Sequence, residues 1–138
     1  MKHLHIRSGV DLMRVSRIES AVSKFGSRFV SRIYTAHEQQ ICGNRVQALA
    51  GRWAAKEAVA KLLGTGLQGL GSGQHAVQWQ SIEIRRDALN KPVVALHDDA
   101  IMVANQLHIK QIDISISHEG EYVIASAVAL CYISDEEI

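Results

Sequence analysis

The sequence of 138 residues has one proline, two cysteines and no long apolar run. A membrane-spanning helix needs about 18 consecutive apolar residues, so no segment is predicted to cross a membrane. Cys42 and Cys131 do not have the spacing of metal ligands, and two cysteines are too few for a disulfide framework. Buried, reduced thiols in a cytoplasmic protein are therefore expected. The first residues, MKHLHIRSGVDL, lack the apolar segment of a secretion signal.

The chain also lacks an excess of either charge, because its formal net charge is +1. No overall field would then attract nucleic acid or an anionic membrane surface, and neither is expected as a partner. Apolar residues make up 47% of the chain and charged residues 21%, as in ordinary globular proteins. The length fits a single domain over residues 1–138, with a modest core.

Hydrophobic patterning predicts several strands and helices. Strands are expected at residues 3–10 and 77–87, and in a hairpin over residues 111–133. The first is expected to break near Gly9, with Asp11 at its end. Within residues 90–96, Pro92 suits a turn that leads into an edge strand. Helices are expected to begin at the capping-box patterns of residues 16–19 and 35–38, and others at about residues 46–63 and 98–108. The glycine-rich residues 64–73 are expected to form a mobile loop, and residues 134–138 a frayed acidic tail.

The longest predicted helix carries charged residues among alanines and leucines. At about 100° per residue, Glu57 and Lys61 share one face with small residues of the preceding turns. Arg52 and Lys56 lie on a different side, and the pattern assigns Lys56 no role. An exposed pair worth about 0.3–0.5 kcal/mol is the simpler interpretation of Glu57 and Lys61. The alternative is a site, because small neighbours let a ligand or another subunit come close.

Asp11 is a second carboxylate of interest, because it ends the first predicted strand and precedes a helix. A turn or N-cap aspartate is the simpler alternative. Asp11 and Glu57 together can hold Mg²⁺, which binds one or two carboxylates, waters and phosphate oxygens. A phosphate here would be held by Lys61 and by loop N–H groups near Gly64 and Gly66. Glycines that are merely flexible are the alternative.

His118 ends the predicted strand DISISH and follows the parity of its isoleucines. It can be an ordinary, partly buried histidine or, beside the glycine turn that follows, a phosphate ligand. The pattern leaves both interpretations open. The other histidines do not have a metal-ligand spacing.

Four segments carry further motifs, which are GVDLMRVSRI, GRWAAKEAVAKLLGTG, SIEIRRDALNKPVVAL and DISISHEGEYVIASAVA. In this order they resemble the G-x-D opening, the K-E-A-x-x-K-x-x-G-T-G signature, the G-[KR]-P turn and the S-[IL]-S-H hairpin of holo-[acyl-carrier-protein] synthases, the small 4′-phosphopantetheinyl transferases. The resemblance extends from about Ile6 to about Leu130. It implies an α+β fold in which an antiparallel sheet packs against a long central helix.

The resemblance implies transfer of 4′-phosphopantetheine from coenzyme A to a serine of apo-acyl carrier protein in fatty acid biosynthesis. Adenosine 3′,5′-bisphosphate is the other product. By the same resemblance, Asp11 and Glu57 are magnesium ligands, Lys61 contacts the coenzyme A phosphates, and these three residues carry catalysis. Glu57, directly or through a metal-bound water, is the candidate general base. Further residues in segments that line the nucleotide site are Arg52, Gly64, Thr65, Lys91, Pro92, Ser117 and His118.

The resemblance also implies a homotrimer with active sites between subunits, and an acidic carrier protein as partner. Residues 13–34 carry five basic residues against one acid, Glu19, so local charge can steer such a partner. Arg17, Arg28 and Arg32 match or neighbour the family's carrier-docking helix. A basic, solvated helix face is the alternative for each of them.

The sequence departs from the family pattern in three places. Asn90 stands where the family has glycine, and the turn is expected to survive because asparagine tolerates the left-handed conformation. Trp53 replaces a phenylalanine, an aromatic exchange that a core accepts. The loop over residues 66–78 is longer than in the shortest members, which leaves its closure over coenzyme A open.

Two other functions fit parts of the pattern. A non-catalytic coenzyme A or carrier-protein binding module would bind without transfer, although the retention of Asp11, Glu57 and Lys61 argues against it. A trimeric structural protein would use the Glu57–Lys61 pair to seal an interface. Its melting temperature would not depend on Mg²⁺ or nucleotide.

Overall fold

The computed structural model describes residues 2–69 and 73–137. The helices are α1 (Val15–Phe25), α2 (Ser27–Ile33), α3 (Ala36–Cys42), α4 (Val46–Leu63) and α5 (Asp98–Gln106). The strands are β1 (Lys2–Arg14), β2 (Ile82–Arg86), β3 (Pro92–Leu96), β4 (Ile109–Glu119) and β5 (Tyr122–Ser134). Two short 3-10 turns, η1 (Trp79–Ser81) and η2 (Asp135–Glu137), precede β2 and follow β5.

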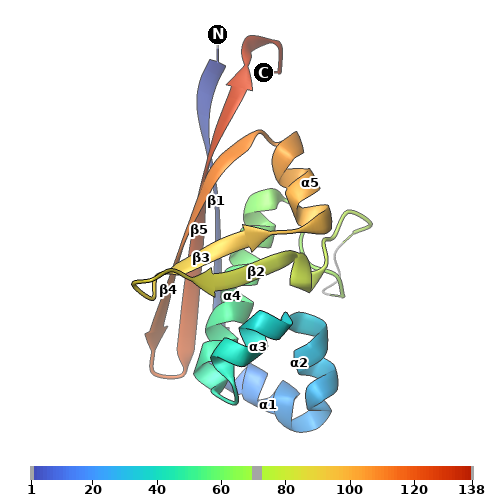
Figure 1. Cartoon of the computed structure of the whole chain (residues 1–138), viewed down its shortest axis with the longest axis vertical. Helices are drawn as coiled ribbons and strands as arrows, with labels where there is room; N and C mark the ends of the chain where they lie inside the picture. The colour runs from blue at the N-terminus through green and yellow to red at the C-terminus, as the bar shows by residue number, and fades with distance from the viewer. Residues whose placement is uncertain (1, 70–72, 138) are drawn as a thin grey trace.

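Two antiparallel sheets surround α4 (Figure 1). The larger sheet has the order β1–β5–β4, and the smaller one consists of β2 and β3. The register of the larger sheet places Asp11 opposite Ala125 and His118 opposite Val123. In Figure 1 the three long strands run side by side, with α1, α2 and α3 at the end where β4 turns into β5 and both termini at the other end.

α4 is the central helix because apolar residues lie on all of its sides. Eleven of its residues are buried. It packs against both sheets and against α1, α3 and α5. The inner face of β5 consists largely of alanines, at positions 125, 127 and 129, so the helix can lie close to the strand. The prediction of an antiparallel sheet packed against a long central helix is therefore confirmed.

β1 approaches α4 very closely at Gly9. A Cβ atom at Gly9 would lie 2.0 Å from the carbonyl oxygen of Ala58 and 2.8 Å from the backbone nitrogen of Leu62. Only a residue without a side chain allows this approach. Because side chains alternate along a strand, Asp11 lies on the same face of β1 as Gly9 and faces α4.

The opposite face of β1 and β5 is apolar and exposed. Eight of its side chains are between 40% and 68% exposed, and they are Leu4, Ile6, Val10, Leu12, Tyr122, Ile124, Val128 and Tyr132. We call this set the outer sheet face. Contiguous apolar surfaces of this kind mark interaction sites more often than ordinary surface.

Several local predictions are confirmed. α4 spans the expected residues and ends at Gly64, which has a left-handed backbone with φ of 79°. Thr35 and Glu38 form a full capping box at the start of α3. Asn90 has a positive φ of 65°, so the turn does survive the exchange of glycine for asparagine. Trp53 lies between two other aromatic rings of the core, with centroids 5.8 and 4.2 Å away.

Two predictions near the N-terminus are wrong. β1 does not break near Gly9 but pairs with β5 without interruption as far as Arg14, so Asp11 lies inside the strand. The expected capping box of residues 16–19 does not form, because α1 already begins at Val15. The Val15 N–H donates to the carbonyl oxygen of Glu121 in the β4–β5 turn, at 2.7 Å, so the start of α1 is tied to that turn.

Two further predictions are wrong in their extent. The strand expected at residues 77–87 is limited to β2, because Trp79–Ser81 form a 3-10 turn. The tail is not frayed over residues 135–137, which also form a 3-10 turn, and Asp135 contacts the side chain of His3. In both places a tertiary contact outweighs the local pattern.

The predicted glycine loop falls partly outside the described residues, since 70–72 are not among them. Its described part is tied to the core. Leu67 is buried and bridges to Val77, and the carbonyl oxygen of Gln68 accepts a hydrogen bond from the Trp79 indole at 2.9 Å. The expected buried thiols are confirmed, because Cys42 and Cys131 are both buried and free. Among the described residues, no helix combines the length and the apolar character that crossing a membrane requires.

We expect Gly9→Ala to destabilise the protein by about 3 kcal/mol, because the new methyl group would meet backbone atoms of α4 that cannot rotate away. Chemical denaturation measures this loss. Gly73→Ala is the matched control, because a Cβ atom at Gly73 would meet nothing within 4 Å, and its effect should stay within about 0.5 kcal/mol. Equal stability of the two variants would contradict the close contact.

Candidate active site

Asp11 and Lys61 come together where β1 crosses α4. The Lys61 Nζ donates to the carbonyl oxygen of Val10 at 2.9 Å and to the Asp11 carboxylate at 3.2 Å. The Asp11 side chain is 15% exposed and the Lys61 side chain 52%. The pair is thus open to solvent on the lysine side, where a ligand can reach it.

Glu57 completes an acidic cluster with Asp11. Burial raises the pKa of Glu57, and the negative charge of Asp11 raises it further, while Lys61 and Arg17 act in the opposite direction. Two carboxylates therefore lie within electrostatic reach of each other. A bound cation would relieve their repulsion, and the raised pKa makes Glu57 a stronger base than an exposed glutamate.

The donor set of this cluster fits Mg²⁺. Magnesium is typically held by one or two carboxylates, with water and phosphate oxygens as its remaining ligands. Asp11 and Glu57 supply two carboxylates on adjoining elements. Among residues 2–69 and 73–137, no group of three or more His, Cys, Asp or Glu side chains is placed to hold a metal ion.

A basic cavity of about 230 Å³ lies between α3, α4, the β2–β3 hairpin and β4. Its lining residues are Ile41, Arg45, Ala48, Gly51, Arg52, Arg86, Asn90, Pro92, Ile116 and His118. Three guanidinium groups and an imidazole face one small space, without a carboxylate among the lining residues. Such a set suits a phosphate group, which arginine binds through two parallel hydrogen bonds.

Two features on α4 shape this cavity. A Cβ atom at Gly51 would lie 3.3 Å from the Ile116 side chain and 3.4 Å from the His118 ring, so the glycine keeps the space open. The Arg52 Nε is buried and has no hydrogen-bond acceptor in the part of the chain that the structure describes. A bound anion would supply the missing acceptor.

Of the residues predicted from the resemblance to line the nucleotide site, Arg52, Pro92 and His118 meet in the basic cavity. The His118 ring also contacts the carbonyl oxygen of Gln47 at 3.1 Å. Gly64 and Thr65 lie beyond the end of α4, after Lys61.

Lys91 and Ser117 are not among the cavity lining. Lys91 is paired with the carboxylate of Asp113 at 2.5 Å. Ser117 is exposed, and it alternates with the cavity residues Ile116 and His118 on β4, so it faces the other side of the sheet.

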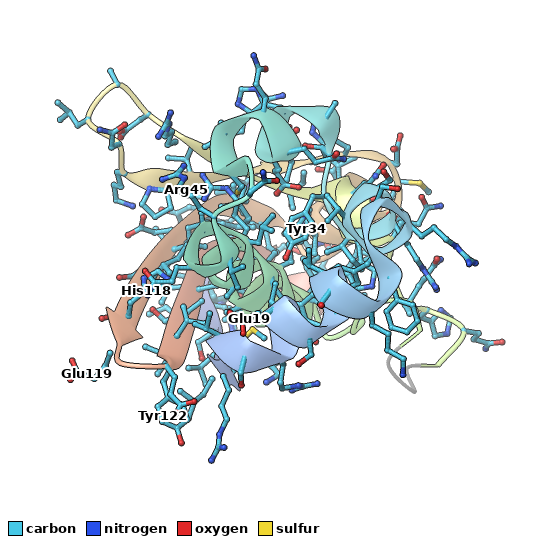
Figure 2. All side chains as sticks on the ribbon, turned by 90° about the horizontal axis from the view of Figure 1, so that it is seen from below. Glu19, Tyr34, Arg45, His118, Glu119 and Tyr122 are labelled. Atoms are coloured by element: carbon cyan, nitrogen blue, oxygen red, sulfur yellow. The ribbon has the colours of Figure 1, made fainter. Side chains whose placement is uncertain are left out.

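Arg45, Arg86 and Asn90 line the cavity but were not predicted as site residues. The sequence offered one signal for two of them, since Arg86 and Asn90 flank the turn of the K-P motif. Arg45 directly precedes α4 and donates to the carbonyl oxygens of Ile41 and Cys42. Figure 2 shows Arg45 and His118 beside the same end of α4.

The acidic cluster and the basic cavity lie on opposite flanks of α4. Arg52 and Lys61 are nine residues apart, which corresponds to about half a turn around the helix axis. One flank faces β1 at Gly9, and the other faces β4 at Ile116. A single phosphate group therefore cannot contact both sets within one chain.

The predicted docking residues lie on the first two helices. Arg17 is on α1, and Arg28 and Arg32 are on α2, with all three exposed. Arg17 is close enough to Glu57 to influence its pKa. Arg32 lies next to the glycine loop, 3.2 Å from the position of a Cβ atom at Gly69. The basic surface thus extends from the acidic cluster to this loop.

Comparison with known proteins places this geometry in a family. Residues 7–127 match the family described as "ACPS: 4′-phosphopantetheinyl transferase superfamily". The holo-[acyl-carrier-protein] synthase of Herpetosiphon aurantiacus is 46% identical over 123 residues, which cover 89% of this chain and 97% of that protein. The protein of the same name from Alkaliphilus oremlandii is 42% identical over 125 residues, covering 88% and 96%.

Solved structures agree with this relation. The holo-[acyl-carrier-protein] synthase of Neisseria meningitidis is 36% identical and superposes with a TM-score of 0.77, covering 89% of this chain and 96% of that chain. The Helicobacter pylori enzyme of the same name, in complex with coenzyme A, is 29% identical with a TM-score of 0.76, covering 88% and 98%. With this family match and these relatives in sequence and fold, the chain belongs to the 4′-phosphopantetheinyl transferase superfamily.

Proposed function

We propose that this protein transfers 4′-phosphopantetheine from coenzyme A to a serine of apo-acyl carrier protein, in fatty acid biosynthesis. The observation that carries the proposal is the presence of both the Asp11–Glu57–Lys61 cluster and the basic cavity around Arg52 in a member of this superfamily. A single transferase domain over residues 1–138 and a cytoplasmic location are part of the same proposal.

The basic cavity would hold the phosphorylated nucleotide half of coenzyme A. Arg45, Arg52, Arg86 and His118 offer donors to phosphate oxygens, and Pro92 offers an apolar surface to the base. The coenzyme A complex of the Helicobacter pylori relative supports this class of ligand. Lys61, Gly64 and Thr65, with Lys91 and Ser117 as weaker candidates, would contact the rest of the molecule.

Asp11 and Glu57 would hold Mg²⁺ beside the pyrophosphate. The ion, when bound, neutralises negative charge that develops on the leaving adenosine 3′,5′-bisphosphate. Lys61 adds a positive charge at the same place. The serine oxygen of the carrier attacks the phosphorus that bears pantetheine, the bond from that phosphorus to the bridging oxygen breaks, and Glu57 accepts the serine proton.

We further propose a homotrimer whose active sites are shared between neighbouring chains. The acidic cluster and the basic cavity lie on opposite flanks of α4. This supports a shared site, in which the acidic cluster of one chain would face the basic cavity of its neighbour. The outer sheet face supports it as well, since association would bury eight apolar side chains.

Arg17, Arg28 and Arg32 would dock the acidic carrier protein. All three are exposed, and Arg17 lies within electrostatic reach of Glu57, so a carrier held on α1 and α2 would present its serine near Glu57. Opposite charge also accelerates the encounter of the two proteins.

The transfer and its metal ligands are tested together by mass spectrometry. With coenzyme A and Mg²⁺, the protein should add one phosphopantetheine to apo-acyl carrier protein. Asp11→Asn and Glu57→Gln should each lower the rate by about 100-fold or more, since each removes a charge that binds the ion. Glu136→Gln, at an exposed acid of the C-terminal turn, is the control and should leave the rate unchanged.

The outcomes of this assay separate the rival functions. No mass gain on several carriers would overturn the transferase. Stabilisation by coenzyme A without transfer would indicate a binding module. No response to either coenzyme A or Mg²⁺ would indicate a structural protein, and normal rates of both carboxylate variants would remove the metal assignment.

Arg17→Glu tests the docking surface. We expect KM for the carrier to rise about tenfold, because the exchange replaces attraction by repulsion at the basic surface. KM for coenzyme A should change less than about twofold, and the defect should shrink at high salt. Lys110→Glu, an equally exposed exchange on β4, is the control. An equal rise of both KM values for Arg17→Glu would contradict a docking role.

Shared sites predict that two inactive variants rescue each other. Arg52→Ala removes a cation of the cavity and Glu57→Gln a ligand of the acidic cluster. When the two are co-expressed, random assembly gives about one quarter of neighbouring pairs an intact residue at both positions. We expect about that fraction of wild-type activity in the transfer assay. Activity no higher than that of either variant alone would argue for a site within one chain.

A further inference from the structure

Lys56 and Glu38 form an ion pair in the interior of the protein. Their charged atoms are 2.8 Å apart, and both side chains are fully buried. Burial lowers the pKa of Lys56, and the neighbouring Glu38 acts against this shift. Removing two charges from water costs free energy, which the pair offsets only if its remaining donors and acceptors are also hydrogen-bonded.

Each proton of the Lys56 ammonium has an acceptor. Besides Glu38, the Nζ donates to the carbonyl oxygens of Trp79 at 3.0 Å and Ile82 at 2.6 Å. These carbonyls belong to η1 and to the first residue of β2. Lys56 therefore ties the middle of α4 to the start of the β2–β3 hairpin.

Glu38 extends this connection to α3 and further into β2. One carboxylate oxygen accepts a hydrogen bond from the Thr35 N–H at 2.8 Å. The other accepts from the Ile84 N–H at 2.7 Å. Without this hydrogen bond, β2 could shift its register relative to the helix. The buried Glu38 carboxylate therefore fixes the position of β2 against α3.

Glu83 adds a second anchor on the other side of the strand. It accepts hydrogen bonds from the Thr35 hydroxyl at 2.6 Å and the Arg85 Nε at 2.7 Å, and it contacts the His97 ring at 3.1 Å. Burial raises the pKa of Glu83, but these three hydrogen bonds outweigh it and lower the value to about 2. The anchor stays ionised at any ordinary pH.

The anchored segments are the walls of the basic cavity. Arg86, Asn90 and Pro92 come from the β2–β3 hairpin, and Arg52 comes from α4, one turn before Lys56. We propose that the Lys56–Glu38 pair is a positioning device, which fixes the hairpin against α4 so that these side chains converge on one phosphate. The inference rests on the proposed nucleotide role of the cavity, and it assigns a task to a lysine that touches no substrate.

Lys56→Met tests the proposal, because methionine fills a similar volume without donors. We expect affinity for adenosine 3′,5′-bisphosphate, measured by calorimetry, to fall on the order of tenfold or more, because misplaced binding groups lose affinity steeply. Hydrogen exchange in residues 82–96 should become faster. KM for the carrier should change much less than the nucleotide affinity, because none of the hydrogen bonds of Lys56 and Glu38 described above reaches α1 or α2.

Ile18→Ala is the control for general loss of stability, because Ile18 is buried on α1, away from the cavity. It should lower the melting temperature but leave nucleotide affinity and hairpin exchange unchanged. If both variants lose affinity equally, or if Lys56→Met binds like the wild type, the positioning role is overturned.

If Lys56→Met does not fold, the double variant Lys56→Met with Glu38→Leu replaces the whole pair by apolar residues, an exchange that buried pairs often tolerate. It should fold and still bind the nucleotide about tenfold more weakly than the wild type, and wild-type affinity would overturn the proposal. The exchange measurement needs no ligand. It therefore tests the anchoring of the hairpin even if the wild-type protein binds no nucleotide. Absence of nucleotide binding by the wild type would count against the proposed function, not against the anchoring.

Discussion

The contact between the backbones of β1 and α4 at Gly9 is the constraint on which the acidic half of the site depends. A strand and a helix come this close only where one has no side chain and the surrounding residues are small, a condition that Gly9 and the alanines of α4 and β5 fulfil. The contact brings Asp11 to Glu57 and lets Lys61 reach the backbone of Val10. Because backbones rather than mobile side chains set this distance, the two carboxylates are arranged before a ligand arrives.

α4 transmits this order to the rest of the molecule. It is a rigid, buried helix that presents the acidic cluster on one flank and Arg52 on the other. The neighbouring residues Lys56 and Glu57 face these different surroundings. Glu57 turns towards β1 and solvent, whereas Lys56 turns inward and donates its hydrogen bonds to acceptors within the protein. In the proposed mechanism, Glu57 would thus serve substrate chemistry and Lys56 the architecture, because about 100° of rotation around the helix axis separates these neighbours.

The sequence predicted those features that depend on local pattern. The extent of α4, its glycine end and the common face of Glu57 and Lys61 follow from helical periodicity and capping. Pattern could not reveal the pairing of Lys56 with Glu38, which are 18 residues apart, because it requires α3 to pack against α4. It also could not reveal the meeting of Arg45 with Arg86, because that requires the β2–β3 hairpin to fold over the start of α4. The pattern predicts a strand break at Gly9 because glycine serves both turns and close contacts, and only the tertiary fold distinguishes the two uses. The proposed roles of Asp11 and Glu57 come from family resemblance, because spacing alone favours an exposed Glu57–Lys61 pair and a turn or N-cap aspartate at Asp11.

The outer sheet face has a consequence for how the protein behaves in solution. In the proposed assembly, a single chain would have no complete active site, and its apolar outer sheet face would be exposed to water. The fraction of active protein would then depend on the protein concentration through mass action. Dilution would then lower the activity per chain as well as the amount of enzyme. A cell that makes little of this protein would have disproportionately little transferase, and newly made chains would become active only on meeting others of their kind.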